Sequence, residues 1–290
     1  MKNGTLMGLN KIRLFIELVK FEHTIFALPF AYLGALLAFR GIFPLSYWLW
    51  ITLAMVGART AGMALNRLID CKIDAKNLRT ANRALPQGLI PLWQVWLLVF
   101  GGFFLLFFSA YHLNFLALVL SPLAIVLLVS YSYFKRFTWA THFGIGVILA
   151  CAPMGGWIAI RGDITFLPVI LSLGVLCWAA GFDIIYAMQD LKFDQEENLY
   201  SIPRSFGLKK ALTISKTLHL LTITCLFNLG ILAHLTIYYW VGLVMATILL
   251  VYEHRLISPF DLSKVNQAFF AANGLFSLTV FIFTTLSLAK

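Results

Sequence analysis

The stretch Asn66-Arg-Leu-Ile-Asp70-Cys-Lys-Ile-Asp74 interrupts an otherwise apolar chain, and Tyr186-Ala-Met-Gln-Asp190-Leu-Lys-Phe-Asp194 repeats its four-residue step later in the sequence. We call these stretches the first and the second acidic signature. Side chains four residues apart lie on one face of a helix, so each signature directs its carboxylates toward one spot. Converging carboxylates repel one another unless divalent cations lie between them, and Mg²⁺ bound through few carboxylates usually keeps a phosphate as a further ligand. The two signatures therefore predict a diphosphate site.

The composition indicates an integral membrane protein. Hydrophobic residues occupy 61% of the 290 positions and the mean hydropathy is +0.87, whereas soluble domains contain about 45–50% apolar residues. The apolar runs have the length of helices that cross a bilayer, and alternating strands of the kind found in barrels are absent from the sequence. We expect an all-α polytopic protein that forms one domain over residues 1–290. The nine expected spans are approximately 24–40, 46–66, 92–110, 113–132, 140–160, 165–188, 211–232, 234–252 and 266–288.

The distribution of basic residues predicts the orientation, because Lys and Arg accumulate in cytoplasmic loops. Most of the 22 Lys and Arg residues lie in the N-terminal segment and in the loops after the second, fourth, sixth and eighth spans. We therefore expect a cytoplasmic N-terminus, cytoplasmic loops 67–91 and 189–210, and a location in the inner membrane of a bacterium. Anionic lipids and an anionic substrate account for the net charge of +10. We infer neither a nucleic acid nor an obligate protein partner.

Arg59 lies two helical turns before Asn66 and returns to the same face. An Arg within a membrane span costs about 2.5–3.5 kcal/mol on insertion scales and commonly serves a function. One interpretation pairs it with a helix carbonyl or with one of the acids. The interpretation that we favour is an anion bound deeper than the diphosphate, such as the carboxylate of a small acceptor, which suits the planar guanidinium.

Further polar side chains flank the signatures. Arg79 and Arg83 follow the first signature, and Lys135 lies where the fourth span ends; each agrees with a cytoplasmic loop, and together they could neutralise a departing diphosphate. Asp183 and Tyr186 precede Asp190 on the same face, and an ionisable group in a membrane helix seldom faces lipid. Asp183 is then either a buried, hydrogen-bonded acid or a functional one. The histidines, including His23 and His142, show no metal-ligand spacing, and we assign them no role.

These stretches resemble the motifs of a known family. The first signature, continued through Arg79-Thr-Ala-Asn-Arg83-Ala-Leu-Pro86, resembles the first aspartate-rich motif of UbiA-type intramembrane aromatic prenyltransferases. Asp183-Ile-Ile-Tyr186, continued through the second signature, resembles the second motif, and Tyr131-Ser-Tyr-Phe-Lys135-Arg136-Phe-Thr resembles the segment after the fourth helix. At Arg67 and Tyr200 the sequence differs from the residues that are frequent in the family, and these differences concern which subfamily it resembles. The resemblance implies a nine-helix bundle whose central cavity is capped by the two cytoplasmic loops and is open sideways to lipid.

The resemblance also implies a reaction, namely Mg²⁺-dependent transfer of a polyprenyl group from its diphosphate to a ring carbon of 4-hydroxybenzoate or a similar aromatic acid in respiratory quinone biosynthesis. The expected ligands of two Mg²⁺ ions are Asp70, Asp74, Asp190 and Asp194, assisted by Asn66. The departing diphosphate would be stabilised by Arg79, Arg83 and Lys135. Arg59 would orient the carboxylate of the acceptor, Asp183 would polarise the acceptor or receive a proton, and Tyr186 would contact the diphosphate or the allylic cation.

Other acceptors and one other protein class remain open at this point. A dihydroxynaphthoate is the alternative acceptor, followed by an acceptor without a carboxylate, as in haem farnesylation. A cation-coupled transporter would also contain membrane carboxylates and an intramembrane Arg. Its acids should lie near the midplane on broken helices, whereas the acids here are expected at cytoplasmic helix ends.

Overall fold

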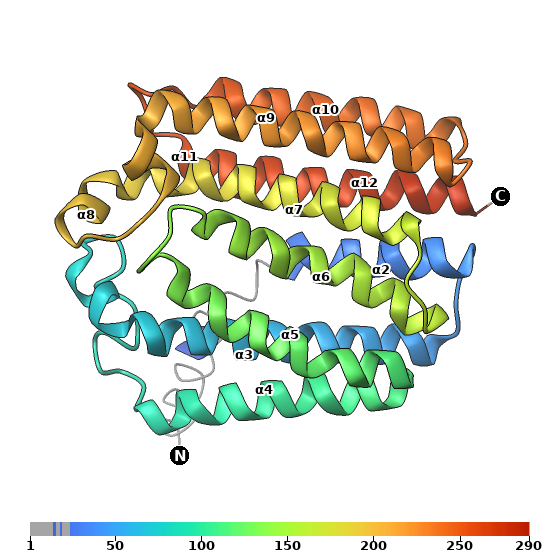
Figure 1. Cartoon of the computed structure of the whole chain (residues 1–290), viewed down its shortest axis with the longest axis horizontal. Helices are drawn as coiled ribbons and strands as arrows, with labels where there is room; N and C mark the ends of the chain where they lie inside the picture. Colours follow the sequence, from blue (N-terminus) through green and yellow to red (C-terminus); the bar gives the residue numbers. More distant parts are fainter. Residues whose placement is uncertain (1–13, 16–17, 19–23, 290) are drawn as a thin grey trace, which may run out of the picture.

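The computed structural model describes residues 14–15, 18 and 24–289, and all regular secondary structure within them is helical. The helices are α2 (Thr24–Phe39), α3 (Leu45–Lys76), α4 (Leu92–Leu113), α5 (Phe115–Phe134), α6 (Thr141–Arg161), α7 (Phe166–Ala187), the 3₁₀ turn η2 (Met188–Asp190), α8 (Leu191–Glu196), α9 (Ile202–Leu232), α10 (Ile237–Leu256), α11 (Val265–Gln267), the π-helical turn η3 (Ala268–Ala272) and α12 (Asn273–Leu288). Figure 1 shows that the long helices lie nearly side by side.

The helical membrane bundle that the composition predicts is confirmed. Within the described residues, eight helices are long and apolar enough to cross a bilayer, and a shorter apolar helix covers Phe26–Phe39. Each of the nine predicted spans overlaps one of these helices. The basic residues Lys2, Lys11, Arg13 and Lys20 of the predicted cytoplasmic N-terminal segment lie outside the described residues, as does His23.

Two predicted boundaries were wrong, and both concern the candidate site. We expected the second span to end near residue 66, but α3 continues to Lys76, so Asp70 and Asp74 lie on the helix itself. We expected the seventh span to begin near residue 211, but α9 begins at Ile202 and contains a kink at Gly207, where φ is 79°. Both helices continue into polar sequence, which an apolar run cannot indicate.

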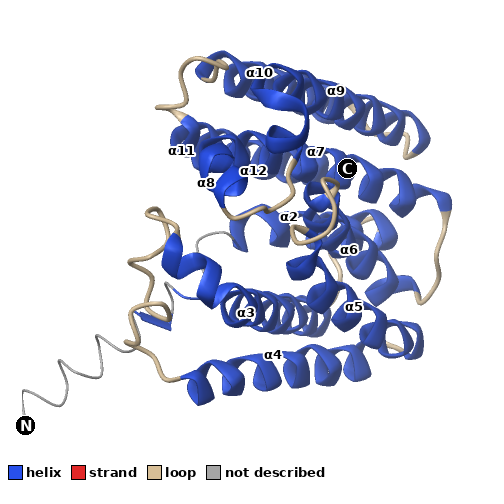
Figure 2. Ribbon diagram, turned by 60° about the vertical axis from the view of Figure 1, so that its left-hand side comes forward, coloured by secondary structure: helices blue, strands red, loops and turns tan. Residues whose placement is uncertain are grey.

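The helices form two groups joined by a central pair. Figure 2 shows α3, α4 and α5 on one side and α7, α9, α10 and α12 on the other, with α2 and α6 between them. The most extensive packing joins α3 to α4, α7 to α6 and α9, and α2 to α6. The two acidic signatures therefore come from helices of different groups.

Glycines fix the position of the helix that carries the first signature. A Cβ atom on Gly57 of α3 would lie 2.6 Å from the carbonyl oxygen of Gly102 on α4, and a Cβ atom on Gly102 would lie 2.7 Å from the carbonyl oxygen of Gly57. The two backbones consequently touch, which is the way in which small residues pack helices inside membranes. A larger side chain at either position would push α3 away from α4.

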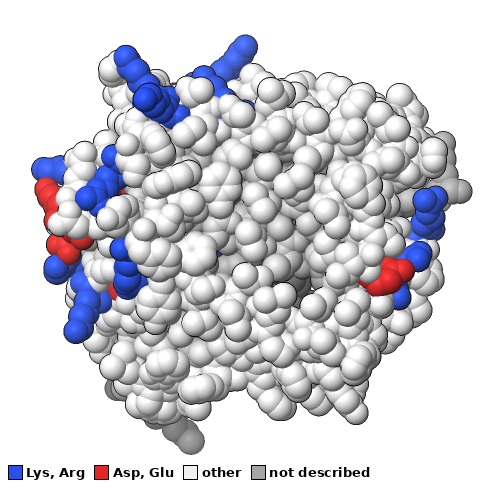
Figure 3. Space-filling model, in the orientation of Figure 1, with Lys and Arg blue, Asp and Glu red and all other residues white. Residues whose placement is uncertain are grey.

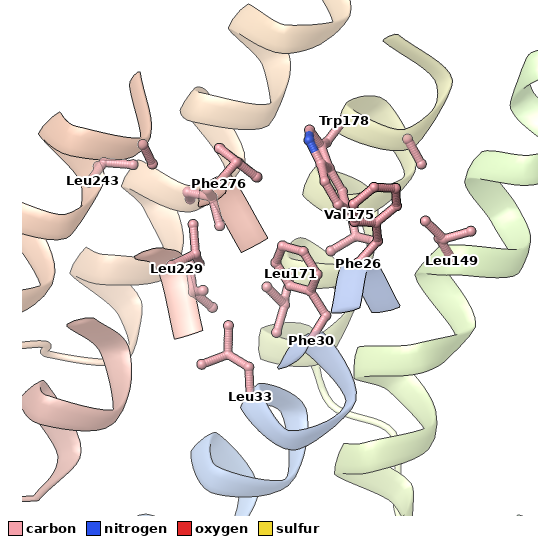
Figure 4. Packing of buried hydrophobic residues seen from close by; sticks show 14 of the residues in the cluster. Phe26, Phe30, Leu33, Leu149, Leu171, Val175, Trp178, Leu229, Leu243 and Phe276 are labelled. Carbon is pink, nitrogen blue, oxygen red and sulfur yellow. The ribbon is translucent and has the colours of Figure 1, made fainter. Parts of the chain in front are cut away.

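The largest apolar core lies among α2, α7, α9, α10 and α12. Phe26, Phe30 and Phe276 each lie close to Trp178 in this cluster (Figure 4). The rings of Trp178 and Phe276 stack with centroids 5.2 Å apart, and Trp178 has no exposed surface. Dense van der Waals contact of this kind holds helices together where lipid removes the hydrophobic driving force.

Charged side chains occupy the ends of the molecule. Figure 3 shows Lys, Arg, Asp and Glu gathered at the end where α8 lies, a smaller group at the opposite end, and a broad, largely uncharged surface between them. Large apolar side chains of α4 are exposed on the flank, among them Phe100 at 65% and Phe104 at 67%. This distribution suits a protein that crosses a bilayer with one strongly charged end.

Candidate active site

The predicted site residues gather at the end of the molecule where α8 lies. The helices α3, α5 and α7 end there, α6 and α9 begin there, and the loop after α3 covers the same end (Figure 1). Each of these helix ends carries part of the site. Arg59 is the exception, since it lies farther inside on α3.

Asp70 is surrounded by hydrogen-bond donors. Its Oδ2 atom accepts from Lys135 Nζ at 2.6 Å and from Asn66 Nδ2 at 3.0 Å, and its Oδ1 atom accepts from Arg136 Nη2 at 3.0 Å. The carboxylate is almost fully buried, with 3% of the residue exposed. A buried carboxylate needs such partners, and two cations here compensate one negative charge. Asn66 also donates to Ser132 of α5 at 3.3 Å.

Asp74 faces the loop that follows α3. Arg83 Nη1 donates to its Oδ2 atom at 2.7 Å, and Arg67 Nη1 lies 3.7 Å from the same oxygen. The Thr80 hydroxyl donates to the Asp74 carbonyl at 2.9 Å and fixes the loop to the helix. Arg67 therefore has a place in the electrostatics of the site, although the sequence indicated only that it departs from the family pattern.

The second signature does not form one continuous α-helical face, which corrects our interpretation of its spacing. α7 ends at Ala187, the 3₁₀ turn η2 covers Met188–Asp190, and α8 begins at Leu191. The change of helix type alters the rotation between Tyr186 and Asp190, and the two acids of this signature have different hydrogen-bond partners. Asp194 Oδ2 accepts from the Ser201 hydroxyl at 2.7 Å, at the start of α9.

Asp190 joins the two signatures. Asn77 Nδ2 donates to its Oδ1 atom at 3.1 Å, and Arg79 grips both carboxylate oxygens, with Nε at 3.0 Å from Oδ1 and Nη2 at 2.5 Å from Oδ2. Arg79 Nη1 also donates to the Tyr186 hydroxyl at 3.0 Å, and its guanidinium carbon lies 5.1 Å from the centre of that ring. The structure thus brings the loop of the first signature onto the acid of the second. Lys76 and Glu197 add an ion pair at 2.6 Å between the same two regions.

The charge of Arg79 is maintained by this arrangement. Burial lowers the pKa of its guanidinium, but the hydrogen bonds and the charge of Asp190 outweigh burial and raise the pKa above its ordinary value. Asp74 contributes in the same direction. Arg79 consequently interacts with acids of both signatures and stays cationic.

The donor atoms suit a hard divalent cation, although the described arrangement does not present them as a metal site. Mg²⁺ prefers carboxylate and amide oxygens, and the signatures supply these. Within the described residues, however, no three His, Cys, Asp or Glu side chains come close enough to hold one ion. Asp70, Asp74 and Asp190 each accept hydrogen bonds from basic side chains. Metal binding therefore requires those bases to move, and the two-ion site stays a prediction.

His142, to which we assigned no role, lies directly against Asp183. The Nδ1 atom of His142 is 2.7 Å from Asp183 Oδ2, and the backbone N–H of Ile202 donates to Nε2 at 3.2 Å. Because Nε2 accepts, Nδ1 carries the proton and donates to the carboxylate. His142 is 2% exposed. The sequence offered one signal of this role: His142 lies at the start of a membrane span, shortly after Lys135, and a buried imidazole needs polar partners.

Arg59 lies deeper than the acids. It precedes Asp70 by three turns of α3, which corresponds to roughly 16 Å along the helix axis at about 1.5 Å per residue. Arg59 interacts electrostatically with Tyr131 of α5, as Arg67 does. The backbone of Arg59 therefore lies deeper in the bundle than that of Asp70. Its proposed role toward the acceptor stays a prediction.

The sequence of this chain is similar to those of known proteins. The model of the UbiA prenyltransferase family matches residues 27–281. A curated 4-hydroxybenzoate octaprenyltransferase of Francisella tularensis subsp. novicida (strain U112) is 27% identical over 246 residues, which cover 85% of this chain and 86% of that protein. The protein of the same name from Xanthomonas campestris pv. campestris (strain B100) is 29% identical over 235 residues, which cover 80% of this chain and 76% of that protein.

Two solved structures share the fold. The apo structure of a UbiA homolog from Aeropyrum pernix K1 is 33% identical, with a TM-score of 0.79, and the match covers 92% of this chain and 96% of that chain. A UbiA homolog from Archaeoglobus fulgidus bound to DMAPP and Mg²⁺ is 18% identical, with a TM-score of 0.72, and the match covers 95% and 98% of the two chains. At that identity the second likeness is one of fold alone.

Proposed function

The chain belongs to the UbiA prenyltransferase family, and from this premise we propose that it transfers a polyprenyl group from polyprenyl diphosphate to a ring carbon of 4-hydroxybenzoate or a similar aromatic acid. The membership makes the protein a membrane-embedded transferase. Relatives named 4-hydroxybenzoate octaprenyltransferase support the choice of acceptor. The product would serve respiratory quinone biosynthesis, in the inner membrane of a bacterium, and residues 1–290 would act as one domain.

The observation that carries this proposal is the contact between the loop after the first signature and the second signature. Arg79 and Asn77, which follow the first signature, hydrogen-bond to Asp190 of the second. Carboxylates and basic side chains thus lie next to one another in one small area at the end of the helix bundle. A diphosphate with accompanying cations is the kind of ligand that such an area can accept.

Asp70, Asp74, Asp190 and Asp194, with Asn66, would hold the metal, and we expect two Mg²⁺ ions. A relative of the same fold bound to DMAPP and Mg²⁺ supports Mg²⁺ as the metal. When bound, the metal supplies positive charge that stabilises the departing diphosphate. Lys135, Arg79 and Arg83 now bind the carboxylates, and once released from them these side chains are placed to donate hydrogen bonds to phosphate oxygens.

The other site residues would serve the acceptor and the proton. The bond between the allylic carbon and the diphosphate oxygen breaks, the ring carbon ortho to the hydroxyl forms a bond to that allylic carbon, and the ring proton leaves. Asp183 receives this proton, and His142 keeps its carboxylate oriented by donating from Nδ1. The Tyr186 ring faces the allylic cation, which aromatic faces stabilise. Arg59 binds the acceptor carboxylate deeper in the bundle.

The test uses purified protein in lipid nanodiscs with a prenyl diphosphate and Mg²⁺. The acceptors are 4-hydroxybenzoate, a dihydroxynaphthoate and a phenol without a carboxylate, and the products are identified by mass spectrometry. We expect prenylated 4-hydroxybenzoate, and we expect Asp70→Asn and Asp190→Asn to reduce turnover at least about 100-fold, the scale on which removal of charge stabilisation acts. Asp163→Asn is the matched control, because Asp163 pairs with Arg161 at the opposite end of the molecule.

Full turnover in Asp70→Asn and Asp190→Asn would refute the assignment of the acids. Product formed from the dihydroxynaphthoate alone would favour the alternative acceptor instead. A transporter has less support, because the acids lie at helix ends beside basic residues and not at the middle of the bundle.

A further inference from the structure

A second polar cluster lies inside the apolar core, apart from the acidic signatures. It consists of Trp178 of α7, His219 of α9, Glu253 and His254 of α10, and Asn273 of α12, and we call it the Asn273 cluster. Glu253 and Asn273 have no exposed surface. Polar groups buried in a membrane protein are costly to maintain and commonly serve a function. The proposed reaction uses none of these side chains directly.

Both the oxygen and the nitrogen of the Asn273 amide form hydrogen bonds. Its Oδ1 atom accepts from Trp178 Nε1 at 2.7 Å, and its Nδ2 atom donates to Glu253 Oε1 at 2.8 Å. The same Nδ2 atom also donates to the backbone carbonyls of Phe269 at 3.2 Å and Ala268 at 3.4 Å. An amide with two N–H groups can satisfy this set only if one points to Glu253 and the other to the carbonyls.

Those carbonyls belong to the π-helical turn η3. Such turns are rare, and they occur frequently near functional sites. Asn273 follows η3 directly and bonds back to its first two residues, so it stabilises the wider turn. If the turn reverted to an α-helix, the register would change by one residue and Phe269 would rotate by roughly 100° about the helix axis.

Phe269 connects this turn to the candidate active site. Its ring centroid lies 4.4 Å from that of Tyr186 and 5.3 Å from that of Phe182. The hydroxyl of Tyr186 accepts from Arg79, which in turn binds Asp190. A continuous series of contacts therefore runs from Asn273 through Phe269 and Tyr186 to the acid at which the two signatures meet.

We propose that Asn273 is a positioning residue that holds Phe269 against Tyr186, and that Phe269 with Tyr186 forms the wall on which the first isoprene units of the substrate pack. The inference rests on the proposed function. A short prenyl chain depends on this wall for most of its contacts, whereas a long chain also contacts the bundle and lipid farther out. Loss of the wall therefore reduces the use of short substrates more than that of long ones.

The test compares kcat/KM for geranyl diphosphate and octaprenyl diphosphate, both with 4-hydroxybenzoate, in Asn273→Leu, Phe269→Leu and the double variant. We expect each single variant to lower the ratio of short-chain to long-chain kcat/KM about tenfold. The double variant should lower it no further than the stronger single one, because both changes remove one interaction. Glu253→Gln keeps an acceptor for Asn273 and should leave the ratio within about twofold of the wild type.

Thr284→Val is the matched structural control. Thr284 is fully buried on α12 and donates to the Val280 carbonyl within its own helix. This variant should change the melting temperature without changing the ratio. An Asn273→Leu protein that loses stability but keeps the wild-type ratio, or a double variant with additive effects, would overturn the positioning role.

Phe269→Leu keeps the proposal testable if Asn273→Leu fails to fold, because an unchanged ratio in Phe269→Leu alone overturns the proposed wall. Failure of the proposed wall can be distinguished from failure of the proposed function. A wild-type protein that prenylates no acceptor refutes the reaction, and the preference is then measured from the rise in melting temperature that each diphosphate produces. If wild type and Phe269→Leu show the same preference between the two diphosphates in that measurement, the proposed wall is also refuted.

Discussion

Replacing Arg79 with Ala should change metal binding and turnover in opposite directions. Arg79 holds Asp190 with two hydrogen bonds, and the side chains are 31% and 17% exposed. Exposed ion pairs contribute about 0–1 kcal/mol, and breaking a buried pair costs about 3–5 kcal/mol. This partly exposed pair lies between those limits, at about 1–2 kcal/mol. Removing the competing guanidinium should therefore tighten Mg²⁺ binding by roughly 5–30-fold, since about 1.4 kcal/mol corresponds to a factor of ten.

Turnover should fall in the same variant. Arg79 is also placed to stabilise charge on the departing diphosphate, and loss of one such donor costs about 2.7–4 kcal/mol in the transition state, or roughly 100–1,000-fold in kcat. The half-saturating Mg²⁺ concentration and kcat are both obtained from initial rates of prenyl transfer at varied Mg²⁺. The control is Arg161→Ala, which breaks a similar pair at the opposite end, where Nε and Nη2 of Arg161 donate three hydrogen bonds to the Asp163 carboxylate. An Arg79→Ala enzyme that needs as much Mg²⁺ as the wild type, or more, would refute the idea that Arg79 competes for Asp190.

Three other changes test separate parts of the site. His142→Leu should lower kcat about 10–100-fold with little change in KM for the diphosphate, because Asp183 loses the donor that orients it. His142→Gln should restore part of the rate, and equal kcat in wild type and His142→Leu would contradict the orienting role of His142. Arg59→Ala should raise KM for a carboxylated acceptor about tenfold and leave KM for the diphosphate unchanged, as steady-state kinetics would show; an unaltered acceptor KM excludes the carboxylate contact. Leu78→Cys in a Cys71→Ser background should react with a membrane-impermeant maleimide in inverted vesicles and not in intact cells, since Leu78 is 94% exposed at the charged end. The reverse result would show that the charged end faces away from the cytoplasm.

The sequence indicated which polar residues lie at one end of the bundle, and it was less accurate about where the helices that carry them begin and end. The four-residue step correctly indicated that Asp70 and Asp74 belong to one helix, although α3 extends farther than its apolar run. The same step misled for Tyr186 and Asp190, because the 3₁₀ turn before Asp190 keeps the spacing in sequence but changes the rotation per residue. Spacing describes positions along a chain, and it carries no information about the type of turn between them.

The partners of these acids could not be predicted for a different reason. Asn77 and Arg79 reach Asp190 across the gap between two helix groups, and that contact depends on how the groups pack. Asn273 offers the same lesson, because a single amide in an apolar stretch gives no local sign that it caps a π-helical turn. Pairwise contacts between distant segments require the packed structure.

If the acids hold Mg²⁺ as we propose, the distribution of charge at the site predicts that metal and diphosphate bind together. Asp70 and Asp74 are each neutralised by two basic side chains, and Asp190 by one, whereas Asp194 accepts from the uncharged Ser201 hydroxyl. A cation that enters alone has to separate existing ion pairs, and a diphosphate that enters alone meets carboxylates that its own charge repels. When both enter, the bases gain phosphate oxygens as new partners while the carboxylates gain the cation, so no charge is left unpaired. In this proposal each ligand increases the affinity for the other by the same factor, and the ion pairs disfavour the binding of either one by itself.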